Sequence, residues 1–135
     1  MNFPFLGKRR EDHRTHDAEG IGDLLADCDL LRSQASREGV RLDDSALSLE
    51  QLDQVLPRWR GDEEILTWLG NDAGLYLGTV IVRTVPGAAW FIRSDGQPVV
   101  RLSSGREFDV VASGHEWATD GVPELSQLYG EVAEV

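Results

Sequence analysis

The sequence contains one cysteine and one lysine, and none of its uninterrupted apolar runs is long enough to cross a bilayer. Cys28 alone can form neither an intramolecular disulfide nor a thiolate metal cluster, which predicts a protein of the reducing cytoplasm. A spanning helix needs roughly 20 consecutive apolar residues, so no membrane partner is expected. The amino terminus places apolar residues before basic ones, the reverse of a secretory signal, so export is not expected.

Positive charge is also scarce. Thirteen Lys and Arg residues stand against 24 Asp and Glu residues, and the net charge is −11. Proteins that bind nucleic acid usually carry the opposite sign, so no nucleic-acid partner is expected. Residues 1–20 hold four basic and four acidic side chains, so the whole excess lies on residues 21–135. Such an acidic surface attracts basic protein partners and accelerates their association.

The length and composition are those of one domain. The 135 residues, 41 % of them apolar, can bury one hydrophobic core but not two of ordinary size. The balanced, mixed charge of residues 1–19 predicts a mobile amino-terminal arm. Residues 20–135 are predicted to form a single α+β domain.

Two helices are predicted in the first half of this domain. Apolar residues at helical spacing predict a helix that begins at Ile21 and ends before Gly39. Its buried stripe is predicted to consist of Ile21, Leu24, Leu25, Cys28, Leu31 and Ala35. A second helix is predicted to begin at Ser48, where Gln51 completes a capping-box pattern.

The next stretch predicts a long central helix. Asp62 is placed to cap a helix that runs to about Arg83. Apolar residues fall on two separate arcs of this helix, the second of which contains Trp68. A helix that is apolar on two sides packs on two sides, so we expect it in the middle of the domain. The β-branched residues in 79–85 leave a strand there as the alternative.

Glycine recurs at every fourth position of this helix, at Gly70, Gly74 and Gly78. Each interior glycine costs a helix about 1 kcal/mol relative to alanine, so the bare positions must serve a purpose. The simplest purpose is close approach of another helix or of the sheet. A homodimer whose seam is this glycine ridge is the alternative. The ridge is not a phosphate loop, because no Gly-Lys-Ser/Thr ending follows it.

A three-stranded antiparallel meander is predicted after the central helix. A three-residue loop over residues 95–97 places Trp90 opposite Leu102 and keeps the core face apolar. A second short loop pairs Arg101 with Glu107, which brings opposite charges together on the outer face.

The third strand is predicted to carry Phe108 and Val110 on one face, and a closing helix is predicted to begin near Pro123. The predicted fold is therefore α+β. Amino-terminal helices and a glycine-ridged central helix pack on a small three-stranded meander, and a carboxy-terminal helix closes the domain.

Trp59 is the first candidate for binding. All four tryptophans lie in or beside predicted elements, and core packing is expected for most of them, but Trp59 lies between Arg58 and Arg60 in a predicted loop. Aromatic side chains flanked by arginine are typical anchors of protein interfaces. Trp59 is therefore expected to be exposed.

Asp72, Tyr76, Arg101 and His115 are the remaining candidates. A carboxylate on a largely buried helix must find hydrogen-bond donors or raise its pKa, and such groups mark some binding sites. The ordinary alternative is that Asp72 accepts from a backbone N–H or an arginine. If the four side chains converge, they line a polar pocket.

No catalytic residue, metal site or cofactor is predicted. His13 and His16 have the spacing of metal ligands, but the same segment offers no fixed third or fourth ligand. A Ser-His-Asp arrangement can be drawn around His115, but the nucleophile turn of such enzymes is missing from the sequence. Cys28 lies among leucines, where a thiol is buried and unreactive.

Four segments together resemble a small-protein family of Streptomyces and relatives that is known only as a domain of unknown function. They are residues 57–60 (PRWR), 68–78 (WLGNDAGLYLG), 87–90 (GAAW) and 96–102 (GQPVVRL). The resemblance implies an actinobacterial origin, in line with a single lysine against twelve arginines. The arrangement is more loosely similar to small bacterial α+β domains that include proposed immunity proteins. The family brings no established activity, so the resemblance implies no catalytic residue.

These observations predict a non-enzymatic, acidic, cytoplasmic protein that acts by protein–protein contact, in a regulatory or immunity-like role. Its partner is expected to be a protein, with a basic one favoured by the net charge. The alternative is a small-molecule-binding protein or hydrolase with a polar pocket near Asp72 and His115. A flat acidic face around Trp59 would favour the first hypothesis, and convergent polar side chains would favour the second.

Overall fold

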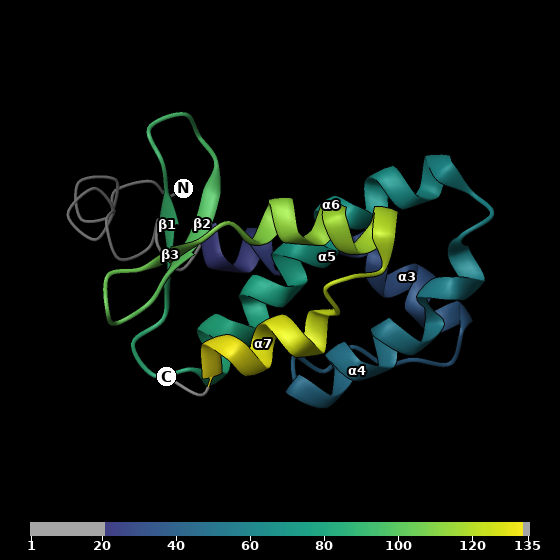
Figure 1. Cartoon of the computed structure of the whole chain (residues 1–135), viewed down its shortest axis with the longest axis horizontal. Helices are drawn as coiled ribbons and strands as arrows, with labels where there is room; N and C mark the ends of the chain where they lie inside the picture. Colours follow the sequence, from purple (N-terminus) through teal and green to yellow (C-terminus); the bar gives the residue numbers. More distant parts are fainter. Residues whose placement is uncertain (1–20, 134–135) are drawn as a thin grey trace, which may run out of the picture.

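The structure is a computed structural model that describes residues 21–133. Residues 21–25 are helical. The elements that follow are α3 (Asp29–Arg37), α4 (Ala46–Val55), the 3-10 helix η2 (Leu56–Trp59), α5 (Glu63–Thr84), β1 (Ala89–Ile92), β2 (Pro98–Arg101), β3 (Glu107–Phe108), α6 (Val110–Asp120) and α7 (Leu125–Ala133). The sheet lies at one end of the molecule and the helices fill the rest (Figure 1). The predicted α+β class is confirmed, whereas the predicted arm of residues 1–19 lies outside the described residues.

Helix α5 is the centre of the fold, as predicted. The Asp62 side chain caps it by accepting from the backbone N–H of Ile65, at 3.1 Å. The helix continues to Thr84, so the alternative strand over residues 79–85 is wrong. Between residues 69 and 81 most residues are buried, although Asn71 is exposed. The expected packing on both arcs is incomplete, however, because Trp68 is 64 % exposed.

The glycine ridge of α5 is filled from within the domain. A Cβ on Gly74 would lie 2.7 Å from the Cα of Val111, and one on Gly78 would lie 2.9 Å from the Cζ2 atom of the Trp90 ring. Gly114 of α6 meets Gly74 in turn, because a Cβ on Gly114 would lie 2.6 Å from the Gly74 Cα. Helix α6 and strand β1 therefore both pack closely on the glycines of α5. These glycines are covered inside the domain and are not available as the seam of a homodimer.

Helix α6 is absent from the sequence prediction. The third strand ends at Phe108, Asp109 caps α6 through the N–H of Ala112 at 3.1 Å, and Val110 is the first residue of the helix. The expectation that Val110 lies on a strand is therefore wrong. The buried face of α6 includes three small residues, Ser113, Gly114 and Ala118, beside Val110 and Trp117. Such a face carries little hydrophobic signal.

The predicted first helix is broken in the middle. Cys28 adopts a left-handed conformation with φ of 46°, and α3 begins at the next residue. The Cys28 thiol donates to the backbone carbonyls of Leu25 and Asp72, at 3.4 Å each. One predicted member of the buried stripe, Leu24, is instead 72 % exposed. The predicted end is confirmed, because Gly39 follows α3 with φ of 80°.

Helix α4 begins earlier than predicted. Ser45, not Ser48, is its N-cap and accepts from the N–H of Ser48 at 3.3 Å. Ser48 is buried on the inner face of the helix. Further along, Asp53 joins three elements, because its carboxylate accepts from the Trp117 indole at 2.9 Å and from the N–H of Leu125 at 2.9 Å. Asp53 thereby caps α7, which begins close to the predicted position.

The first hairpin is shifted relative to the prediction. Trp90 pairs with Val100 and not with Leu102, because the loop closes between Arg93 and Gln97, one residue earlier than expected. The shift moves the pairing by two positions, so Trp90 keeps its place on the core face. The second hairpin pairs the residues that the sequence predicts, residue 101 with residue 107.

Helix α5 is also the element of the described chain that is long and apolar enough to cross a membrane. Its best 18-residue window has a mean hydropathy of 1.3, although glycines and polar residues interrupt the apolar runs. Just over half of this window, 56 %, is buried inside the domain. A central core helix passes the same test of length and composition, so this property does not assign α5 to a membrane.

The glycine contacts make a stability prediction. Replacing Gly74 by alanine places a methyl group against the backbone of α6, which can move aside only by separating the two helices. We expect Gly74→Ala to lower the free energy of unfolding by about 3 kcal/mol. Urea unfolding followed by circular dichroism measures the change.

The matched control is Gly130→Ala in α7, where a new Cβ would meet nothing within 4 Å. There the better helix propensity of alanine is expected to stabilise the protein by up to about 1 kcal/mol. Equal stability of Gly74→Ala and the unchanged protein would contradict the close packing of α5 on α6.

Candidate functional site

The structure buries the tryptophan that the sequence predicts to be exposed. Trp59 is 6 % exposed and belongs to the main hydrophobic core. In the tight turn of η2 its neighbours point elsewhere: Arg58 pairs with Glu38 at 2.9 Å, and Arg60 lies against Gly121. Trp59 is therefore not an interface anchor in this structure.

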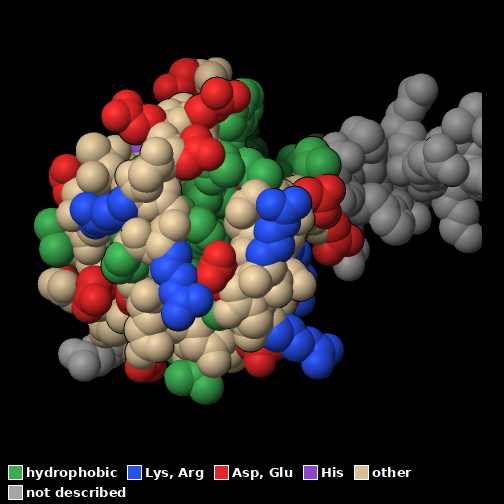
Figure 2. All heavy atoms as spheres, turned by 90° about the vertical axis from the view of Figure 1, so that its right-hand side faces the viewer, with side chains coloured by type: hydrophobic (Ala, Val, Ile, Leu, Met, Phe, Trp, Pro, Cys, Tyr) green, Lys and Arg blue, Asp and Glu red, His purple; other side chains and the backbone are tan. Residues whose placement is uncertain are grey.

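A different tryptophan is exposed. Trp68 lies in the second turn of α5 and shows 64 % of its surface to solvent. Glu64 lies four residues before it and Asp72 four residues after it, so all three share one face of the helix. At the top of Figure 2, over the first turns of α5, Asp and Glu side chains border exposed hydrophobic ones.

Asp72 connects this face to the start of α3. Its carboxylate accepts from the backbone N–H of Leu31 at 3.1 Å, in the first turn of α3. The ordinary alternative considered from the sequence, a carboxylate bound to a backbone N–H, is thus confirmed. Asp27 precedes this turn and Asp29 lies in it, and both are exposed. We call Glu64, Trp68, Asp72, Asp27 and Asp29 the Trp68 surface.

Three carboxyl groups of the Trp68 surface, those of Asp27, Asp29 and Asp72, act on one another. A side-chain hydrogen bond with Asp29 and the negative charge of Asp29 raise the pKa of the Asp27 carboxyl above its ordinary value. The charge of Asp72 contributes in the same direction to a smaller extent. A cation placed among these carboxylates would relieve the repulsion.

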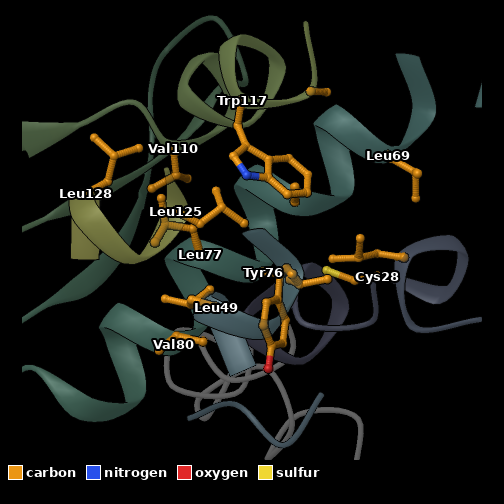
Figure 3. Close-up of a cluster of buried hydrophobic side chains, with 14 of the residues drawn as sticks. Cys28, Leu49, Leu69, Tyr76, Leu77, Val80, Val110, Trp117, Leu125 and Leu128 are labelled. Carbon is orange, nitrogen blue, oxygen red and sulfur yellow. The ribbon is translucent and has the colours of Figure 1, made fainter. Parts of the chain in front are cut away.

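Tyr76 has a structural position. It is fully buried, and its hydroxyl accepts from the N–H of Asp44 at 2.8 Å and lies 2.6 Å from the Ser48 hydroxyl. Tyr76, Cys28 and Trp117 are among the buried side chains of Figure 3. Burial raises the pKa of the tyrosine hydroxyl above its ordinary value. Tyr76 thus connects α5 to the start of α4.

Arg101 and His115 lie elsewhere. Arg101 stands on the sheet, where it donates to Glu107 at 2.8 Å and covers the ring of Phe91 at 3.7 Å. That hydrogen bond holds the pKa of the Glu107 carboxyl below its ordinary value. His115 is exposed on α6 and contacts α5 at Gly70.

The four polar candidates therefore do not form one pocket. Asp72 and Tyr76 face α3 and α4, whereas His115 lies on α6 beside Gly70, so α5 separates them. Arg101 lies on the sheet. His115 instead lines a cleft of about 500 Å³ between α5 and α6, together with side chains that the sequence does not single out. No three His, Cys, Asp or Glu side chains of residues 21–133 converge to hold a metal ion.

The structure defines a small α+β protein whose central helix packs on its neighbours through glycines. One of its surfaces is acidic and carries an exposed tryptophan. The chain belongs to a family of unknown function, DUF6278, whose family model matches residues 1–135. No curated protein matches the chain, and no solved structure does. The predicted membership in a family of unknown function is confirmed.

The surroundings of Cys28 predict its reactivity. Burial first, and the charge of Asp72 second, raise the pKa of the Cys28 thiol from 9.0 to about 12. At pH 8 we expect iodoacetamide to alkylate the folded protein at least about 100-fold more slowly than the urea-unfolded protein, because the thiolate is the reacting form. Equal rates would contradict the burial of Cys28.

The same shift predicts a pH dependence of stability. The unfolded thiol loses its proton near pH 9, whereas the folded thiol keeps it until about pH 12. The raised pKa therefore stabilises the folded state below pH 9, and this contribution is lost as the pH rises from 9 to 12. Urea unfolding of Cys28→Ala over this range is expected to show a smaller loss than the unchanged protein.

Proposed function

We propose that this protein is a non-enzymatic, cytoplasmic protein that acts by binding another protein, in a regulatory or immunity-like role. The Trp68 surface is the proposed contact, and the proposed partner is basic. The observation that carries the proposal is the 64 % exposure of a tryptophan on an ordered helix, among carboxylates.

The exposed tryptophan supports a protein interface. Aromatic side chains supply most of the binding energy in many interfaces, because they bury a large area at a small cost in conformational entropy. Nothing in the remaining described chain covers Trp68, although most residues of its helix between 69 and 81 are buried. A partner that covered Trp68 would extend this buried stretch towards the start of α5.

The charges support a basic partner. The Trp68 surface carries four carboxylates. A hydrogen bond with Asp29 first, and then the negative charges of Asp29 and Asp72, raise the pKa of the Asp27 carboxyl. A lysine or arginine of a partner would remove this repulsion, and the net charge of −11 would steer such a partner towards the protein. Both effects weaken when salt screens the charges.

The alternative, a small-molecule-binding protein or hydrolase, draws support from the cleft beside His115. Asp72 lies on the other side of α5 and is not part of the lining of that cleft. The cleft holds no arrangement that points to hydrolysis. Ligand binding there is a separate property from the proposed protein contact.

Affinity capture tests the proposal. The immobilised protein is exposed to native lysate of the organism that encodes it, at low and then at moderate salt. We expect a basic protein to be retained at low salt and released at moderate salt. Trp68→Ala is expected to weaken its binding by about 30-fold, the effect of losing a central aromatic anchor.

Leu47→Ala is the control, because Leu47 is exposed to a similar degree, 60 %, but lies on α4. This variant is expected to retain the same protein as the unchanged chain. The proposal is wrong if Trp68→Ala retains the partner equally well, or if no protein is retained and a metabolite co-purifies instead.

A further inference from the structure

A cleft between α5 and α6 is separate from the Trp68 surface. Its volume of about 500 Å³ lies within the range of small-molecule pockets, about 300–1,000 Å³. Its lining consists of Arg60, Glu63, Leu66, Thr67, His115, Ala118 and Thr119. Trp68 points away from this lining, because it falls on the far side of α5 from Glu63 and Leu66.

Two glycines make room for the two basic side chains of the cleft. A Cβ on Gly70 would lie 2.8 Å from the Nδ1 atom of His115, so the imidazole rests on the bare backbone of α5. The Nη2 atom of Arg60 occupies the place that a Cβ on Gly121 would take. Both side chains therefore lie directly against glycine backbone beside the cleft.

The cleft also offers a negative group and an apolar floor. Glu63 is exposed at its rim, and among the ion pairs within residues 21–133 neither Arg60 nor Glu63 takes part. Leu66 is half-buried and Ala118 is buried, so together they form an apolar surface. One cation, one anion and an apolar floor therefore lie around the same hollow.

This combination selects a zwitterion. A planar guanidinium binds a carboxylate through two parallel hydrogen bonds, and a carboxylate binds an ammonium group. A ligand with several negative charges would be repelled by Glu63 and by the net charge of −11, whereas a neutral zwitterion would not. A free α-amino acid carries both charged groups on one carbon and a side chain that can cover the floor.

We propose that the cleft binds a free α-amino acid with a large apolar side chain. Arg60 and His115 receive its carboxylate, Glu63 receives its ammonium group, and Leu66 and Ala118 contact its side chain. The proposal does not depend on the Trp68 surface, because the two lie on different sides of α5.

Nuclear magnetic resonance with the ¹⁵N-labelled full chain tests the proposal. L-phenylalanine and L-leucine, each titrated to about 10 mM, are expected to produce saturable shifts at the amides of Thr67, Ala118 and Thr119. Arg60→Gln is expected to weaken binding about tenfold or more. The matched variant Arg58→Gln is expected to bind normally, because that guanidinium pairs with Glu38 instead.

Two analogues of phenylalanine test the zwitterion itself. 3-Phenylpropionate lacks the ammonium group and 2-phenylethylamine lacks the carboxylate, so each is expected to bind about tenfold more weakly or worse. Glu63→Gln changes an exposed side chain and tests the ammonium contact even if Arg60→Gln lowers the stability of the protein.

Three results would overturn the inference. The first is the absence of saturable shifts at the cleft with either amino acid. The second is unchanged binding by a folded Arg60→Gln or Glu63→Gln variant. The third is binding of 3-phenylpropionate as tight as that of L-phenylalanine, which would make the cleft a site for simple carboxylates. None of these results bears on the capture of a protein through Trp68.

Discussion

The rest of the structure depends on the direct backbone contact between α5 and α6. Gly74 and Gly114 meet without side chains between them, since a Cβ on Gly114 would lie 2.6 Å from the Gly74 Cα. This contact brings α6 onto one side of α5 and leaves the other side to α3. The Trp68 surface and the cleft beside His115 therefore lie on different sides of the same helix, and each can act without the other.

The sequence predicts the elements whose signals are local. Two apolar arcs and the Asp62 cap predict α5 correctly. The alternation of side chains between the two faces of a strand places Trp90 on the core face. The sequence does not predict helix α6, because its buried face includes Ser113 and Gly114, which give no hydrophobic periodicity. Their small size matters because it allows the close contact with the glycines of α5, which only the structure shows. The sequence also does not predict the break of the first helix at Cys28. The Cys28 thiol contacts the carbonyl of a residue 44 positions away, and such a distant contact leaves no local sequence pattern.

The candidate sites show the same division. The role of Asp72 as an acceptor for a backbone N–H follows from the need of a half-buried carboxylate for donors. The assignment of Trp59 fails because charged neighbours in sequence need not share its direction, and the tight turn of η2 points Arg58 and Arg60 away from the core that holds Trp59. The exposure of Trp68 escapes because helical periodicity shows which arc is apolar but not whether another element covers it.

The central claim is that α5 is the buried axis of the domain, and hydrogen exchange of backbone amides tests it most directly. The account predicts that amides between residues 69 and 81, together with that of Gly114, exchange only through global unfolding and share one free energy of opening. Exchange of the amides of Gly70, Gly74 and Gly78 at the rates of an unprotected peptide would contradict it. In that case the helix would not be packed along its glycine ridge.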